Sequence, residues 1–306
     1  MTAIAAVFAY HNVGVRCLSV LLAQGLQVAL VLTHKDNPHE TIWFDSVDRL
    51  ARAHGLPVIT PADANEAEVV ARIRALQPDF LFSFYYRNML GAELLALPRR
   101  GAYNMHGSLL PKYRGRVPVN WAVIMGESET GATLHQMVAK PDAGGIVDQQ
   151  AVPIGPDDTA AEVFAKVTDA AEQVLARALP GLISGSARIL PQDLAQGGYF
   201  GGRKPEDGRI DWTRSARAVH NLVRGVAPPY PGAFTRIGGR CVRILRTRLE
   251  PNRRPREGAP GLYFEDGAFF ADCGDGKVLR VLELDTNGEQ GSSIDPGAYT
   301  NKITFA

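Results

Sequence analysis

The first half of the chain alternates short apolar runs with segments of helical spacing. The apolar runs are Ile4–Ala9, Val28–Thr33, Pro57–Ile59, Phe80–Phe84 and Gly101–Met105. Between them, the spacing predicts helices over Val15–Gln24, Trp43–His54 and Glu66–Leu76, the last with Asn65 as its N-cap. Strands that are apolar throughout and alternate with amphipathic helices are buried on both faces. The pattern therefore predicts an α/β fold with a Rossmann-like, doubly wound parallel sheet.

The second part of the chain has a different texture. After a long helical pattern over Thr159–Leu179, residues rich in glycine and charge lead into a short helix at Ser215–Gly225. Short strand-like pieces follow, at Gly232–Ile237, Val242–Leu249, Gly261–Phe264 and Lys277–Leu284. This order predicts a catalytic domain over residues 1–200 and a smaller, OB-like β-barrel domain over 201–306.

Composition limits the classes of partner. The chain has 306 residues and a formal net charge of +1, so it lacks the basic excess typical of proteins that bind nucleic acid. Three scattered cysteines have no metal-ligand spacing, which predicts reduced thiols and no metal site. Signal-peptide and membrane-spanning patterns are absent. We expect a cytoplasmic protein without membrane contact, and the sequence leaves homo-oligomerisation open.

The densest group of reactive residue types follows the apolar run at Gly101–Met105. Asn104 and His106 are two positions apart, so in an extended strand their side chains point the same way. An asparagine can donate to a developing oxyanion, and a histidine can move protons near neutral pH. A lone histidine at a strand end is more often structural, but the pair is typical of a catalytic site at the carboxyl end of an open sheet.

Asp142 is the natural third member of this group. It lies in a tight Pro-Asp-Ala-Gly-Gly loop that follows a strand-like segment over Thr133–Val138. A carboxylate there could orient the His106 imidazole and favour its protonated form, although an aspartate in such a loop is usually a turn residue. We therefore predict that Asn104, His106 and Asp142 form a catalytic trio.

The segments Asn104–Gly115 and Thr130–Gly145 resemble signatures of the folate-dependent formyltransferases. The similarity covers most of the chain, including Ile210–Trp212 and Pro231–Phe234. This resemblance implies an enzyme that transfers a formyl group from the co-substrate 10-formyltetrahydrofolate to an amine. It implies that Asn104 stabilises the oxyanion, that His106 moves the proton, and that Asp142 raises the pKa of His106. By the same resemblance, the folate pocket is lined by Asn88, Met89, Leu90, Arg116, Val138, Ala139, Lys140 and Pro141.

Other segments narrow the acceptor amine. Val7–His11, Thr33–Pro38 and Phe82–Arg87 are similar to the formyltransferase domain of bifunctional polymyxin-resistance enzymes. The resemblance implies a UDP-aminosugar acceptor, UDP-4-amino-4-deoxy-L-arabinose, and a role in lipid A modification. The dehydrogenase half of those enzymes has no counterpart in these 306 residues. The residues expected to contact this substrate are Tyr85, Tyr86, Arg114, Arg203 and Tyr230.

Two other functions compete with this interpretation. A methionyl-tRNA formyltransferase would share the fold and the trio, and an arginine-rich stretch over residues 236–256 suits a phosphate backbone. The low net charge makes tRNA the less favoured acceptor. A dinucleotide-dependent dehydrogenase or a non-catalytic nucleotide-binding protein is more remote, because Tyr10–Gly14 lacks the GxGxxG turn that follows the first strand in such folds.

Overall fold

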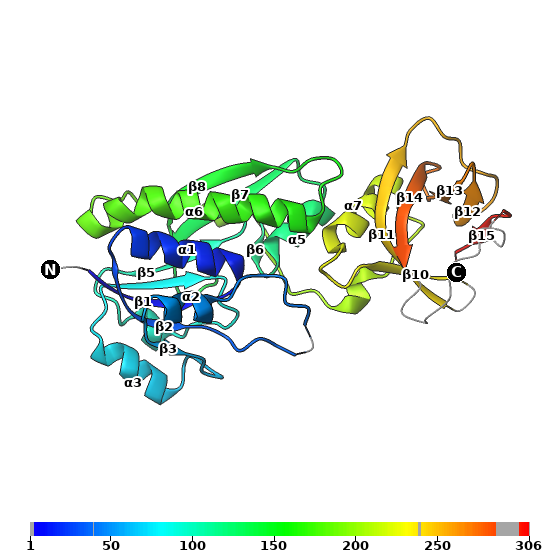
Figure 1. Ribbon diagram of the computed structural model, residues 1–306. Helices are drawn as coiled ribbons and strands as arrows, with labels where there is room; N and C mark the ends of the chain where they lie inside the picture. The colour runs from blue at the N-terminus through cyan, green and yellow to red at the C-terminus, as the bar shows by residue number, and fades with distance from the viewer. Residues whose placement is uncertain (1–2, 39, 238–239, 286–299, 306) are drawn as a thin grey trace. The chain divides into compact units, whose positions relative to one another are not determined.

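The computed structural model describes residues 3–38, 40–237, 240–285 and 300–305 (Figure 1). These residues form two compact units. The described residues of the first unit belong to Met1–Pro118, Glu129–Pro153 and Phe164–Gly201. Those of the second belong to Val119–Ser128, Ile154–Val163 and Gly202–Ala306. Two earlier segments of the chain therefore join the second unit, in addition to the residues after 201.

The first unit is built on a seven-stranded sheet with the order β3-β2-β1-β4-β5-β7-β8. Five parallel strands form its larger part: β1 (Ile4–Ala9), β2 (Gln27–Leu32), β3 (Val58–Ile59), β4 (Phe80–Phe84) and β5 (Ala102–His106). Two antiparallel strands extend it, β7 (Glu129–Gln136) and β8 (Ile146–Pro153). The strand order reverses between β1 and β4, as in Rossmann-like sheets. The predicted fold class is confirmed, with an antiparallel edge added.

Helices cover both faces of this sheet. Ala6 and Phe8 of β1 share a buried cluster with Val70 and Ile73 of α3 (Ala67–Ala75), and α4 (Ala92–Leu95) adds Leu94 to it. On the other face, Gly14 of α1 (His11–Ala23) lies against Ala9. Figure 1 shows α6 (Ala160–Ser184) beside α1, and Arg16 joins them through ion pairs with Asp169 and Glu172. Strands buried on both faces explain the continuous apolar runs.

Local hydrogen bonds move several helix boundaries from their predicted positions. Helix α1 begins at His11, before the predicted Val15, and α2 (Val47–Ala53) begins after the predicted Trp43. The hydroxyl of Ser46 accepts from the Arg49 N–H and so fixes the start of α2. The predicted N-cap Asn65 is wrong. Glu66 occupies that position, and the Asn65 carboxamide instead accepts from the Gly91 N–H at 2.6 Å, a partner distant in sequence.

The second unit contains a six-stranded antiparallel sheet that curves into a nearly closed barrel, which confirms the predicted β-barrel. Its order is β10-β11-β14-β13-β12-β15. The strands are β10 (Ala233–Ile237), β11 (Arg240–Glu250), β12 (Gly261–Glu265), β13 (Ala268–Asp272), β14 (Val278–Asp285) and β15 (Ile303–Thr304). Strand β13 was not predicted; the two-residue turn Asp266-Gly267, both with positive φ, joins it to β12. Helix α7 (Ala216–Val226), capped by Ser215, packs on the barrel core, and α5 (Pro118–Ile124) contributes Ile124 to that core.

The arginine-rich strand β11 changes its exposed face partway along. Val242 and Ile244 are buried, but an irregularity in the pairing with β14 lies between Ile244 and Thr247, after which Thr247 is buried. Arg246 and Arg248 are therefore exposed together, while Arg240 belongs to the other side of the alternation. Several arginines also have acidic partners from other segments. The pairs are Arg243–Asp285, Arg246–Glu162, Arg253–Glu265 and Arg256–Glu265.

Candidate active site

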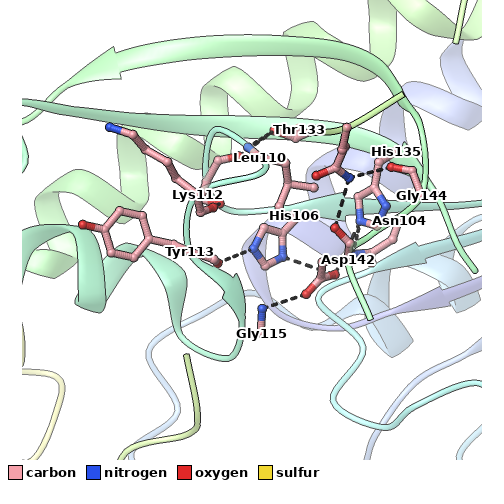
Figure 2. Close-up of polar contacts among 12 residues, drawn as sticks. Asn104, His106, Leu110, Lys112, Tyr113, Gly115, Thr133, His135, Asp142 and Gly144 are labelled. Atoms are coloured by element: carbon pink, nitrogen blue, oxygen red, sulfur yellow. Dashed lines mark hydrogen bonds and ion pairs between the residues drawn. The ribbon is translucent and has the colours of Figure 1, made fainter. Parts of the chain in front are cut away.

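Strand β5 carries Asn104 and His106 to the carboxyl end of the parallel sheet, as the sequence predicts. Its antiparallel neighbour β7 places His135 opposite Asn104 and Thr133 opposite His106. Asn104 is partly buried, whereas His106 and His135 are almost completely buried. Figure 2 shows these side chains converging on Asp142. Two paired strands and one loop therefore assemble the predicted trio and add a second histidine to it.

Asp142 reaches this group from the loop between β7 and β8. Its Oδ1 lies 3.6 Å from His106 Nδ1 and 3.5 Å from His135 Nε2, and its Oδ2 accepts from the Gly115 N–H at 2.8 Å. The backbone of Asp142 has a left-handed φ of 51°. The Gln192 carboxamide donates to the carbonyls of both Asp142 and Gly144, which holds the loop in this position.

The surroundings of Asp142 stabilise its ionised form. Burial raises the pKa of this carboxyl, but His106, His135 and the Gly115 N–H outweigh it and hold the pKa well below its usual range. A carboxyl whose folded pKa is depressed contributes stability above its ordinary pKa, and that contribution is lost as the pH falls towards the folded value. Asp142 is therefore a permanent negative charge at neutral pH.

The tautomer of His106 follows from its two partners. Its Nε2 lies 2.8 Å from the Tyr113 carbonyl oxygen, which can only accept, so Nε2 carries a proton. Nδ1 faces Asp142 and is the atom at which the ring gains or loses its second proton. Burial lowers the pKa of His106, while Asp142 and the Tyr113 carbonyl raise it. The expected effect of Asp142 is thus present, but the net shift is downward, because desolvation of the buried ring is the larger effect.

His135 is a member of the site to which the sequence analysis assigned no role. Its Nδ1 donates to the Gln136 carbonyl at 2.7 Å, so in the neutral form of the ring Nε2 accepts from the Asn104 amide at 3.2 Å. An amide nitrogen has two protons, and this bond uses one and fixes the direction of the other. His135 lies within the Thr130–Gly145 segment, and strand alternation with Thr133 could have placed it on the same face. Only the pairing of β7 with β5 puts it beside Asn104.

The residues expected to bind folate lie in varied surroundings. Met89 and Val138 are 58% and 44% exposed, which is unusual for large apolar side chains, while Leu90 is buried in the core cluster beneath the sheet. The Asn88 carboxamide donates to the Ala62 carbonyl at 3.2 Å. Arg116, Ala139 and Lys140 are exposed, and Pro141 is partly buried. Most of this set thus presents accessible surface on three loops, and Leu90 belongs to the core.

Three of the residues expected to contact substrate, Tyr85, Tyr86 and Arg114, lie in the first unit, and their surroundings differ from one another. The Tyr85 hydroxyl lies against the backbone of Gly107, the residue after His106, so closely that it leaves no room for a Cβ there. Tyr86 is buried and stacks on His34, and burial raises its pKa to about 12. Arg114 is buried, and its guanidinium donates to the carbonyls of Leu194 and Gly197. These bonds account for Arg114 without a substrate, and β6 (Arg114–Gly115) pairs with β9 (Tyr199–Phe200) at the same place.

The other two predicted substrate residues belong to the second unit. The Arg203 guanidinium lies 4.7 Å from the centre of the Trp121 ring and donates to the Asp207 carbonyl. Burial raises the pKa of Tyr230 to about 12, and its side chain is hydrogen-bonded to Asn120 of the same unit. Both side chains therefore have partners within their own unit.

Within the described ranges, no cluster of three or more histidine, cysteine, aspartate or glutamate side chains could hold a metal ion. In the same part of the chain, no helix is both long and apolar enough to cross a bilayer.

Two family models match the sequence in succession. The model described as formyl transferase matches residues 11–179, which is more than half of the chain. The model described as formyl transferase, C-terminal domain, matches residues 203–299. The first match contains the whole trio and His135.

Solved structures share this fold at low sequence identity. The N-formyltransferase from Helicobacter canadensis, in complex with folinic acid and dTDP-3-aminofucose, is 21% identical with a TM-score of 0.69, and the match covers 92% of this chain and 99% of that one. WlaRD, a sugar 3N-formyl transferase with dTDP and 5-N-formyl-THF, is 20% identical with a TM-score of 0.71, over 92% and 98%. HypX from Aquifex aeolicus, with tetrahydrofolic acid, is 17% identical with a TM-score of 0.64, over 96% and 46%.

The effect of Asp142 on His106 can be measured directly. Replacing Asp142 by Asn removes the charge that opposes desolvation, so the pKa of His106 should fall further below its ordinary value of about 6.5. Titration of the histidine ring signals by NMR, with His106→Gln for assignment, gives this value. The unfolded chain would then bind a proton at His106 at a higher pH than the folded chain does. The stability of Asp142→Asn should therefore decline as the pH falls below about 6.5, over a wider pH range than in the wild type. A His106 pKa that is unchanged or higher in Asp142→Asn would contradict this electrostatic account.

Proposed function

Since the chain belongs to the formyl transferase family, we propose that it moves the formyl group of 10-formyltetrahydrofolate to the 4-amino group of a UDP-aminosugar, UDP-4-amino-4-deoxy-L-arabinose. The observation that best supports this proposal is the arrangement of Asn104, His106 and Asp142 at the carboxyl end of β5. It combines an oriented N–H donor with an imidazole supported by a carboxylate. Formyl transfer to an amine needs both groups.

Each residue of the trio has a distinct task in the reaction. As the acceptor nitrogen attacks the formyl carbon, the carbonyl oxygen gains negative charge, and the Asn104 N–H that is not used by His135 stabilises it. The amine must lose a proton and the folate N10 must gain one, so that the C–N10 bond can break and tetrahydrofolate can leave. His106 takes up and releases this proton at Nδ1, and the adjacent Asp142 stabilises the imidazolium.

The predicted folate residues fit a flat, amphipathic co-substrate. Met89 and Val138 expose apolar surface, and so does Val117, beside Arg116. Accessible backbone and apolar side chains on loops at a sheet edge can hold an aromatic ring system. Two structural neighbours with 21% and 20% identity were solved with formylated folates, which supports the same co-substrate here.

The acceptor class is supported by the neighbours and by the segments similar to polymyxin-resistance formyltransferases. The neighbours include sugar N-formyltransferases, one of them with a dTDP-aminosugar. A nucleotide sugar with a free amino group is therefore the favoured acceptor. The choice of uridine and of the 4-amino pentose rests on Val7–His11, Thr33–Pro38 and Phe82–Arg87.

The competing functions have weaker support. A tRNA acceptor would need available arginines, yet Arg243, Arg246, Arg253 and Arg256 each have an acidic partner within the second unit. A dinucleotide-dependent enzyme would need a pyrophosphate close to the start of α1. His11 occupies that place, and its ring packs 4.0 Å from Phe44, 4.5 Å from Trp43 and 4.7 Å from Phe164 between ring centres.

Removing a trio side chain should slow turnover with little effect on folate affinity. We expect Asn104→Ala to lower kcat by about 10²–10³-fold through loss of an oxyanion donor. We expect His106→Ala to lower it by about 10²–10⁴-fold through loss of acid–base catalysis. Steady-state kinetics and calorimetric binding of 5-formyltetrahydrofolate measure the two quantities separately. Equal losses of affinity and rate in both variants would contradict the assignment.

His135 should act as a positioning residue for Asn104. We expect His135→Ala to lower kcat by up to about 100-fold, because the amide loses the bond that directs its second N–H. His135→Gln keeps an acceptor and should recover part of the rate. The matched control is His220, a buried histidine bonded to Thr247 and the Pro156 carbonyl, whose replacement by alanine should lower stability but not the kcat of the folded enzyme. No difference between His135→Ala and His135→Gln would exclude the positioning role.

The acceptor is decided by assay of the purified chain. With 10-formyltetrahydrofolate present, we expect the chain to formylate UDP-4-amino-4-deoxy-L-arabinose and not charged methionyl-tRNA. Mass spectrometry of the product measures this. Formylation of the tRNA alone would replace the proposed acceptor. Turnover of a different nucleotide aminosugar would keep the reaction class and change the sugar.

A further inference from the structure

A cavity of about 350 Å³ opens at the carboxyl ends of β1, β2 and β3, away from the trio. Residues that follow each of these strands line it, together with the first turns of α2. The polar and aromatic side chains that matter here are Tyr10, His34, Lys35, Asp36, Asp48 and Arg52. Its volume lies within the range of small-molecule sites, and no trio residue contributes to the lining.

The position of Asp36 in this cavity is chemically specific. In sheets with this strand order, a carboxylate just beyond the second strand binds the ribose hydroxyls of a nucleotide. Asp36 lies just beyond β2, and the Tyr10 hydroxyl donates to its Oδ1 at 2.8 Å, which engages one of the two carboxylate oxygens. The rings of Tyr10 and His34, 5.2 Å apart between centres, add aromatic surface to the same wall. Carboxylate and aromatic surface together suit a nucleoside.

The charges that line the cavity also suit a nucleotide. Arg52 is held by Asp48 through bonds of 2.8 and 2.9 Å, so these two side chains neutralise each other. Lys35 makes no ion pair with any residue that the structure describes, and it can therefore offer its charge to a phosphate. Asp36 makes no ion pair with a residue that the structure describes, although it interacts electrostatically with Arg87, whose guanidinium is paired with Glu40.

The separation between the cavity and the trio matches one extended acceptor. From β2 to β5 there are three strand-to-strand steps, β2–β1, β1–β4 and β4–β5. At about 4.8 Å per step, the carboxyl ends of β2 and β5 lie roughly 14 Å apart. A diphosphate joined to a pyranose ring spans a comparable length. A nucleoside at the end of β2 can therefore present its sugar amine at the end of β5.

We propose that this cavity binds the nucleoside of the nucleotide-sugar acceptor, and that Asp36 selects ribonucleotides by accepting hydrogen bonds from the ribose hydroxyls. The inference rests on the proposed function and adds a subsite to it. Tyr10 holds the carboxylate towards the ribose, and Lys35 faces the diphosphate. Because the Asp36 carboxylate alone selects ribonucleotides over deoxyribonucleotides, replacing Asp36 should remove the selection.

Calorimetric titration of the full-length protein with UDP and with 2′-deoxy-UDP tests this subsite. Losing a hydrogen bond to a charged acceptor costs about 10- to 100-fold in affinity, so the wild type should prefer UDP by that factor. In Asp36→Ala the two ligands should bind almost equally, because UDP binding weakens while binding of the deoxy ligand changes little. Thermal unfolding and binding of 5-formyltetrahydrofolate establish that the variant is folded.

Three variants serve as controls. Tyr10→Phe keeps the carboxylate but removes the hydroxyl that holds it, so it should weaken the preference for UDP less than Asp36→Ala does. Asp48→Ala removes a carboxylate of the same cavity that is paired with Arg52, and it should also keep the preference. His106→Ala lies outside the cavity and should bind UDP as the wild type does.

The outcomes separate the subsite from the function. Binding of UDP without discrimination by the wild type, or discrimination that persists in Asp36→Ala, would overturn the subsite alone. A wild-type protein that binds neither ligand would overturn the subsite together with the uridine part of the proposed acceptor. Loss of discrimination in Tyr10→Phe or Asp48→Ala to the same extent as in Asp36→Ala would overturn the assignment to Asp36.

Discussion

The ionised carboxylate of Asp142 is the constraint on which the rest of the site depends. A carboxylate in a mostly buried position is unfavourable unless it is paired and hydrogen-bonded. Asp142 meets this condition through His106 of β5, His135 of β7 and the Gly115 N–H of β6. One side chain therefore fixes three segments relative to each other. The same interactions define which nitrogen of His106 exchanges its proton and which way Asn104 points.

The parallel sheet explains why chemistry and recognition lie at one edge. Carboxyl ends of parallel strands meet at the same edge, so residues after β1, β2 and β5 share it although they are far apart in sequence. His11, packed among Phe44, Trp43 and Phe164, fills the place where a dinucleotide would bring its pyrophosphate. The sheet is thereby left with a cavity over β1–β3 and a reactive group at β5 and β7, which suits two separate reactants.

The sequence predicted the features that arise within one segment of the chain and missed those that depend on partners distant in the sequence. Strand β5 and its Asn104–His106 pair followed from an apolar run and the alternation of side chains. His135 received no role, because its importance comes from antiparallel pairing with β5, which no local pattern reveals. Arg114 was expected to meet substrate, yet it holds the carbonyls of Leu194 and Gly197. Arginines of β11 have acidic partners that are distant along the chain, such as Glu162 and Asp285, so the stretch 236–256 alone does not show which of its charges are paired.

The sequence by itself determined the α/β class, the β-rich second unit, and the presence of an asparagine and a histidine on one face of a strand. These features depend on burial and on periodicities of 2 and 3.6 residues, which a single segment contains. Only the tertiary structure decided that Asp142 lies between two histidines, that Tyr113 sets the His106 tautomer, and that burial lowers the pKa of His106 despite Asp142. Hydrogen bonding and desolvation of buried groups depend on partners that the fold brings from distant parts of the chain.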